Sequence, residues 1–166
     1  NIHLCSLIIK KNFNNIFPDT EKDLLKLPGI GSYTAAAILA IAFNKRAVVI
    51  DGNIKRVISR LFFLEKPIKE NYKQIWKFTD LITPFSRVGD FAQSLMDLGS
   101  QICTPSKPKC DQCPIIKECQ SKNNRCENII PKKIKKFKKP LRVGLSFIIT
   151  KNQKVLIYKR MDKGLL

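Results

Sequence analysis

The stretch Leu27-Pro28-Gly29-Ile30-Gly31 decides how the first half of this chain folds. It separates a leucine-rich segment that begins near Thr20 from an alanine-rich segment that runs to about Phe43, and both favour helix. Thr20 and Asp23 are close to a capping box at the start of the first segment. Proline and glycine end that helix, and glycine permits a positive φ and a close backbone approach. The sequence therefore predicts a helix–turn–helix hairpin over residues 20–43.

The helix that follows Gly31 presents its free N–H groups at the positive end of its dipole, which favours phosphate. The chain has 31 Lys and Arg against 13 Asp and Glu, a formal charge of +18. Such an excess is typical of proteins that bind nucleic acid, although a lysine-rich proteome would produce it as well. Leu27 and Ile30 flank the turn, so we expect it to contact a DNA backbone. A plain helix–helix turn is the alternative.

Further helices are predicted downstream. Apolar residues from Ile54 to Phe62 follow the spacing i, i+3, i+4, i+7, i+8, which indicates a helix that starts near Asn53. Residues 70–82 and 88–100 read as two more helices, and residues 1–17 as the tail of an earlier one. Lys55, Arg56 and Arg60 are either phosphate contacts or part of a solvated face.

Asp51-Gly52-Asn53 stands between an apolar run and this basic helix. A carboxylate among apolar neighbours can stabilise a cationic sugar, as carboxylates do in glycoside cleavage. The simpler interpretation is that Asp51 or Asn53 is an N-cap. The two roles are compatible.

Four of the six cysteines fall in residues 103–119 with the spacing C-x6-C-x2-C-x5-C: Cys103, Cys110, Cys113 and Cys119. Structural zinc usually takes its ligands from two close pairs, whereas this loop has one. Four thiolates on one loop suit an iron–sulfur cluster. Zinc, or four unrelated buried thiols, are the alternatives. We interpret Cys5 as a core residue and Cys126 as an unattached thiol.

The character of the chain changes at residues 129–140, which form a basic, proline-bounded linker. Two β-like runs follow, Arg142–Thr150 and Lys154–Lys159, joined by a turn at residues 151–153. The longest apolar run, Ala35–Phe43, is far shorter than the roughly 20 residues that span a bilayer. We therefore expect no membrane segment and a cytoplasmic location, where thiols stay reduced.

In combination, Leu-Pro-Gly-Ile-Gly at 27–31, Asp-Gly-Asn-Ile-Lys-Arg-Val at 51–57, Met-Asp-Leu-Gly at 96–99 and the cysteine set resemble the helix–hairpin–helix iron–sulfur DNA glycosylases. The resemblance covers almost the whole chain. It implies a mainly α fold: a glycosylase core over residues 1–128, with the cluster loop at 103–119. The linker would then lead to the start of a β-containing Nudix-like domain at residues 141–166. No acidic Nudix box is present.

The details resemble the MutY-type adenine glycosylases more than the endonuclease III branch, because Tyr33 occupies the position of that branch's Schiff-base lysine. The resemblance implies release of adenine opposite 8-oxoguanine or guanine in double-stranded DNA, after the base is flipped out. Asp51 would stabilise the sugar cation, with Tyr33 and Asn53 as positioning groups. The implied DNA contacts are Leu27, Gly29, Gly31, Ser32, Lys107 and Lys109, and a [4Fe-4S] cluster would bind the four cysteines.

The resemblance also places the acid that protonates adenine upstream of residue 1. We therefore expect this chain to be a fragment that is inactive by itself, from a bacterial, monomeric enzyme. Two other functions stay open: an endonuclease III-like glycosylase and lyase for oxidised pyrimidines, and a non-catalytic DNA-binding module. A zinc-bound structural domain is a third.

Overall fold

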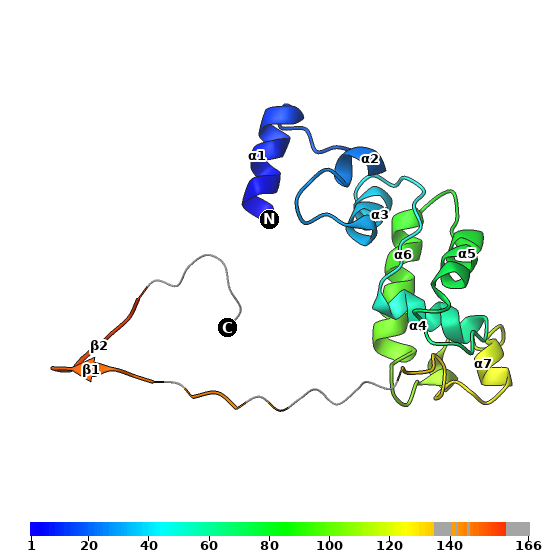
Figure 1. The fold of residues 1–166 in the computed structure, drawn as a ribbon. Coiled ribbons are helices and arrows are strands. Elements are labelled where there is room, and N and C mark those ends of the chain that lie inside the picture. Colours follow the sequence, from blue (N-terminus) through cyan, green and yellow to red (C-terminus); the bar gives the residue numbers. More distant parts are fainter. Residues whose placement is uncertain (135–140, 142, 146, 159–166) are drawn as a thin grey trace. The chain divides into compact units, whose positions relative to one another are not determined.

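The computed structural model describes residues 1–134, 141, 143–145 and 147–158 (Figure 1). Contacts divide the chain into two units, Asn1–Ile134 and Lys135–Leu166. The first unit is helical and the second contains a short hairpin. The mainly α fold expected from the sequence is confirmed. No helix in the described part of the chain is long and apolar enough to cross a membrane.

The first unit opens with α1 (Ile2–Asn12), α2 (Glu21–Leu24) and α3 (Ser32–Ile41). Thr20 is the N-cap of α2 and accepts a hydrogen bond from the Asp23 N–H over 3.3 Å, as the near capping box predicts. We expected this helix to continue to Pro28, but it ends at Leu24. The chain then makes two tight turns, Leu27 N–H to Leu24 O and Ile30 N–H to Leu27 O, both 3.1 Å. These turns direct the side chain of Leu27 into the core.

The helices α4 (Gly52–Leu61), α5 (Tyr72–Ile82) and α6 (Val88–Asp97) follow the periodicity of the sequence. The predicted helix over 88–100 changes type near its end, because Leu98–Ile102 forms a π-helix, η1. A 3-10 turn, η2 (Cys110–Gln112), and the short helix α7 (Gln120–Asn123) complete the unit. Figure 1 shows α4, α5 and α6 gathered together, with α7 beside α4.

Two apolar clusters hold these helices together. Leu24, Leu27, Ala35 and Leu39 form the smaller one, against which α1 packs Cys5, Ile8 and Ile9. The larger cluster joins α3, α4, α5 and α6, with Ile54, Ile58, Ile75 and Val88 fully buried. Gly89 permits the close approach of α6 to α3, since a Cβ there would lie 2.7 Å from Ala40 O. The larger cluster thus contains the buried face of α4, formed by Ile54, Val57 and Ile58.

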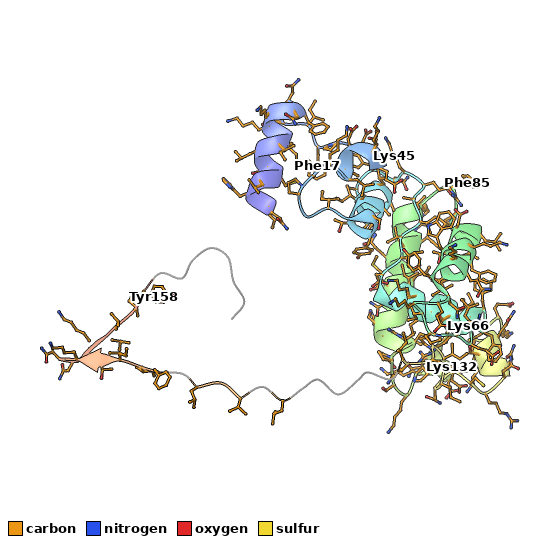
Figure 2. The ribbon with its side chains drawn as sticks, viewed as in Figure 1. Phe17, Lys45, Lys66, Phe85, Lys132 and Tyr158 are labelled. Atoms are coloured by element: carbon orange, nitrogen blue, oxygen red, sulfur yellow. The ribbon has the colours of Figure 1, made fainter. Side chains whose placement is uncertain are left out.

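In the second unit, β1 (Thr150–Lys151) pairs antiparallel with β2 (Lys154–Val155). The turn residues Asn152 and Gln153 both have positive φ, 49° and 61°, as a tight two-residue hairpin requires. The predicted hairpin is present, but its strands are much shorter than the predicted runs. The described side chains of the hairpin are exposed, and Tyr158, labelled in Figure 2, is 82% exposed. A two-stranded hairpin without a packed face is only marginally stable in water, which is consistent with such short strands. Residues 142, 146 and 159 lie outside the described residues.

Candidate functional site

Asp51 is the N-cap of α4, as the simpler interpretation of the sequence held. Its Oδ1 accepts a hydrogen bond from the Ile54 N–H over 2.6 Å, and its Oδ2 accepts one from Asn53 Nδ2 over 3.1 Å. Both carboxylate oxygens are therefore held, and the side chain has one fixed orientation. Asp51 itself is only partly buried, so the cap leaves it accessible to a substrate.

The amide of Asn53 is held in turn by Arg56. Arg56 Nη2 donates to Asn53 Oδ1 over 2.9 Å and to Gly99 O over 2.6 Å, while its Nε donates to Cys103 O over 2.7 Å. Gly99 lies directly against Asn53, and a Cβ at Gly99 would be 2.6 Å from the Asn53 Cβ. A continuous set of hydrogen bonds thus runs from Asp51 to the residue that begins the cysteine loop. This contact explains the glycine of Met-Asp-Leu-Gly, which sequence analysis left unexplained.

Arg60 lies one turn further along α4 and is only 2% exposed. Its Nε donates to Ile130 O over 2.8 Å, and its Nη1 donates to Thr104 O over 2.7 Å and to Cys103 Sγ over 3.2 Å. The expectation that Arg60 contacts phosphate or lies on a solvated face is wrong, whereas Arg56 is half-buried and donates to oxygens of the protein. Both arginines point inward and fasten the cysteine loop to α4. Lys55 is the third basic residue of this helix. Its Nζ lies 5.4 Å from the centroid of the exposed Tyr72 ring.

The four cysteines of the loop line one small cavity, together with Ile102, Pro108, Ile116 and the charged residues Arg60, Lys122 and Glu127. No group of three or more His, Cys, Asp or Glu side chains in the described residues is arranged around a single metal ion. A zinc ion needs four ligand atoms within about 2.3 Å of one point. Four thiols that line one cavity form a soft donor set, of the kind that binds iron–sulfur groups or zinc.

Burial raises the pKa of the Cys110 and Cys113 thiols, and the neighbouring Cys103 and Cys119 add to the effect. Both thiols therefore hold their protons more firmly than a free cysteine does. A bound metal group displaces these protons. The donor set of four cysteines fits such a group.

The turn between α2 and α3 uses its two glycines differently. Gly29 has φ +88°, a conformation that L side chains rarely adopt. Gly31 is the N-cap of α3 with ordinary extended angles, and a Cβ there would meet nothing within 4 Å. The space in front of Gly31 and Ser32 is therefore open to a ligand. Leu27 is only 2% exposed, so its side chain serves the core and cannot contact DNA, which corrects that part of the predicted interface.

Tyr33 is 45% exposed and lines a broad hollow with Ser32, Ile50, Tyr72 and Trp76. The start of α3 therefore borders the hollow, whereas Asp51 does not line it and only its neighbour Ile50 does. Glu21, the first residue of α2, also lines it, and no motif in the sequence predicts that placement. Lys107 and Lys109 are exposed in the cysteine loop, and neither lines this hollow. Arg46, which also lines the hollow, places its guanidinium carbon 4.7 Å from the centroid of the exposed Phe85 ring, labelled in Figure 2.

Comparison with known proteins agrees with this geometry. Residues 12–41 match the model of the helix-hairpin-helix motif. The chain is 39% identical to the adenine DNA glycosylase of Buchnera aphidicola subsp. Baizongia pistaciae, in a match that covers 99% of this chain and 47% of that protein. The chain therefore contains a helix-hairpin-helix motif and is similar over nearly its whole length to adenine DNA glycosylases.

Other glycosylases extend the comparison. The adenine DNA glycosylase of Arabidopsis thaliana is 36% identical, over 90% of this chain and 26% of that protein. A solved thermostable thymine-DNA glycosylase superposes with a TM-score of 0.65 and 33% identity, covering 73% of this chain and 56% of its own. A trapped endonuclease III–DNA covalent intermediate gives a TM-score of 0.61 and 25% identity, covering 75% and 57%. The chain spans 47% of the length of the Buchnera aphidicola relative, about half of it.

Proposed function

We propose that the protein is an adenine DNA glycosylase, which hydrolyses the N-glycosidic bond of adenine opposite 8-oxoguanine or guanine in double-stranded DNA. One observation carries the proposal: the Asp51 carboxylate is fixed by two hydrogen bonds at the mouth of α4 and remains partly accessible. The adenine DNA glycosylases among the relatives support the choice of base. The partner is duplex DNA, and we expect a monomer that acts in the bacterial cytoplasm.

Asp51 would stabilise the positive charge that develops on the sugar as adenine leaves. Asn53 holds the carboxylate in place through its 3.1 Å hydrogen bond. Tyr33, on the wall of the hollow beside Ile50, would help to position the sugar. Because position 33 carries a phenol and no amine, we expect base removal without Schiff-base cleavage of the strand.

The DNA backbone would lie at the start of α3. Gly31 and Ser32 offer backbone N–H groups at the positive end of that helix, with open space before them. Gly29 shapes the turn through its positive φ. Lys107 and Lys109, both exposed, would reach phosphates from the cysteine loop.

Cys103, Cys110, Cys113 and Cys119 would hold a [4Fe-4S] cluster, since all four line one cavity and thiolates are the ligands of such clusters. Its contribution when bound is to cross-link a loop that Arg56 and Arg60 already fasten to α4. We further propose a glycosylase core over residues 1–128, a linker over 129–140 and the start of a Nudix-like domain at 141–166. The contact boundary between residues 134 and 135 falls within that linker.

The test is single-turnover release of adenine from a duplex with adenine opposite 8-oxoguanine, using the full-length protein and its Asp51→Asn variant. Asparagine is as good an N-cap as aspartate, so the variant keeps the cap on the Ile54 N–H, while it loses the charge and the oxygen that accepts from Asn53 Nδ2. We expect base release to fall at least about 100-fold while the thermal stability hardly changes.

An uncut strand with free adenine would support the proposal. Nicking of a duplex that carries an oxidised pyrimidine, with no adenine released, would move the protein to the endonuclease III branch. Normal affinity for the duplex without release of any base would instead favour a non-catalytic binding module.

A further inference from the structure

Two charged side chains on the wall of the cysteine cavity take no part in the function proposed above. Lys122 lies on α7, three residues after Cys119, and Glu127 follows Cys126. Lys122 Nζ and Glu127 Oε1 are 3.2 Å apart, and both residues line the cavity together with the four cysteines. Arg60 is the third charged residue there.

The two members of this pair are not equally screened by solvent. The Glu127 side chain is 14% exposed, and its second oxygen, Oε2, is inaccessible and has no hydrogen-bond partner among the described residues. The Lys122 side chain is 37% exposed. Water screens an exposed charge more than a buried one. The two charges act on the cavity in opposite directions, and Lys122 lowers the pKa of Cys110 more than Glu127 raises it.

Arg60 acts in the opposite direction. Its Nη1 donates to Cys103 Sγ over 3.2 Å, so a buried positive charge contacts one thiol of the set directly. The cavity thus holds a fixed cation on one cysteine and, on its wall, the mostly buried Glu127 carboxylate paired with the more exposed Lys122. The reduction potential of an iron–sulfur cluster depends on the charges, hydrogen bonds and solvent around it.

We propose that the Lys122–Glu127 pair sets the reduction potential of the cluster, with Glu127 lowering it and Lys122 limiting that effect. This inference rests on the proposed [4Fe-4S] cluster. A carboxylate beside an anionic cluster opposes the addition of an electron, and an ammonium beside the carboxylate reduces that opposition. The pair acts on the cluster from the wall of the cavity and not as a ligand.

The experiment is a redox titration of the full-length, cluster-loaded protein, followed through the visible absorption of the cluster. The variants are Glu127→Gln, which keeps the shape of the side chain, and Lys122→Gln. Glu65→Gln is the control for net charge, because Glu65 is exposed and does not line the cavity. We expect a higher midpoint potential in Glu127→Gln, a lower one in Lys122→Gln and no shift in Glu65→Gln.

Equal midpoints in wild type, Glu127→Gln and Glu65→Gln would overturn the inference, and so would a rise in Lys122→Gln. If Glu127→Gln fails to retain its cluster, Lys122→Gln decides the matter, since its partly exposed side chain is not needed for packing. A purified protein without iron and inorganic sulfide would overturn the cluster proposal and this inference together. The adenine-release assay would then still test the enzymatic function independently.

Discussion

Asn53 fixes the carboxylate of Asp51 from within the same helix, because its Nδ2 donates to Asp51 Oδ2 over 3.1 Å. The other end of the Asn53 amide accepts a hydrogen bond from Arg56 over 2.9 Å, so the amide cannot rotate freely. The first turn of α4 therefore presents Asp51 in one orientation. This small network is the part of the structure that most directly supports a catalytic role.

The first prediction concerns Asn53. Replacing it with alanine removes the donor to Asp51 Oδ2 but leaves the cap between Asp51 Oδ1 and the Ile54 N–H. We expect single-turnover base release to fall about tenfold or more, with a loss of stability under about 1 kcal/mol. Asn124→Ala is the control, because its amide bonds only Gln120 O, in α7. Equal rates in the two variants would remove Asn53 from the site.

The second prediction compares two glycines. A Cβ at Gly99 would lie 2.6 Å from the Asn53 Cβ and 3.1 Å from its Cα, so α4 and η1 would have to separate. We expect Gly99→Ala to cost about 1–3 kcal/mol in unfolding free energy and to slow base release. A Cβ at Gly52 meets nothing within 4 Å, so Gly52→Ala should leave stability unchanged or raise it. Urea unfolding of both variants makes the comparison.

The third prediction separates an internal arginine from a DNA contact. Arg60→Gln leaves carbonyl oxygens of Thr104 and Ile130 without their donor, and we expect a loss of about 3 kcal/mol or more in unfolding free energy. Arg87→Gln is the control, since that side chain is 82% exposed and should change stability by less than about 0.5 kcal/mol. Weaker DNA binding by Arg60→Gln at unchanged stability would contradict the structure.

The fourth prediction tests the open space at the start of α3. Because a Cβ at Gly31 meets nothing in the protein, Gly31→Ala should keep the wild-type melting temperature. The same methyl group would stand where we place a phosphate, so we expect duplex affinity at fixed salt to fall about tenfold, equal to roughly 1.4 kcal/mol. Gly29→Ala should instead destabilise the fold, because Gly29 has φ +88°. Unchanged affinity in Gly31→Ala would mean that DNA does not approach this turn.

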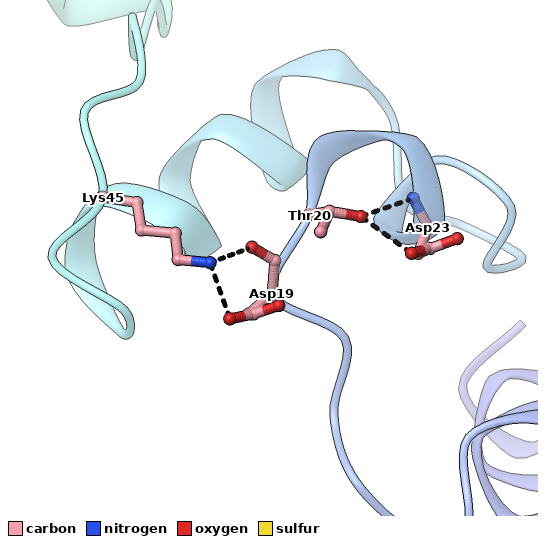
Figure 3. Close-up of polar contacts among 4 residues, drawn as sticks. All are labelled: Asp19, Thr20, Asp23 and Lys45. Carbon is pink, nitrogen blue, oxygen red and sulfur yellow. Dashed lines mark hydrogen bonds and ion pairs between the residues drawn. The ribbon is translucent and has the colours of Figure 1, made fainter.

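The fifth prediction concerns acid stability and the ion pair between Lys45 and Asp19, just before α2 (Figure 3). Lys45 Nζ donates to Asp19 Oδ2 over 2.6 Å and to Asp19 O over 2.8 Å, and this contact holds the pKa of Asp19 below its ordinary value. A depressed carboxyl pKa stabilises the fold above the ordinary value, and the contribution disappears as the pH falls through the folded-state pKa. We expect the melting temperature of Asp19→Asn to fall less steeply than that of wild type in that acidic range.

Both groups are well exposed, so the difference will be modest. Lys45→Gln should reproduce it, and Asp19→Asn should add nothing in the Lys45→Gln background. Additive effects of the two substitutions would show that the ion pair is not the cause.

Local features of the chain were predictable because their causes lie within a few residues. Thr20 caps Asp23 three residues on, and the spacing from Ile54 to Phe62 forms the buried face of α4. The hairpin turn follows from Pro28 and Gly29, whose backbone preferences need no distant partner. The four cysteines line one cavity because they lie on one loop, and their grouping is visible in the sequence.

The roles of Arg56, Arg60 and Gly99 were decided by tertiary structure alone. Arg56 and Arg60 donate hydrogen bonds to carbonyl oxygens more than 40 residues away, in the cysteine loop. From the sequence alone, a basic residue on an amphipathic helix is expected to be solvated, because the distant loop that covers it is not visible there. Gly99 is required by the approach of Asn53, and no pattern near residue 99 encodes that contact. Helix periodicity depends on neighbours along the chain, whereas burial of a charge depends on which distant carbonyl oxygens surround it.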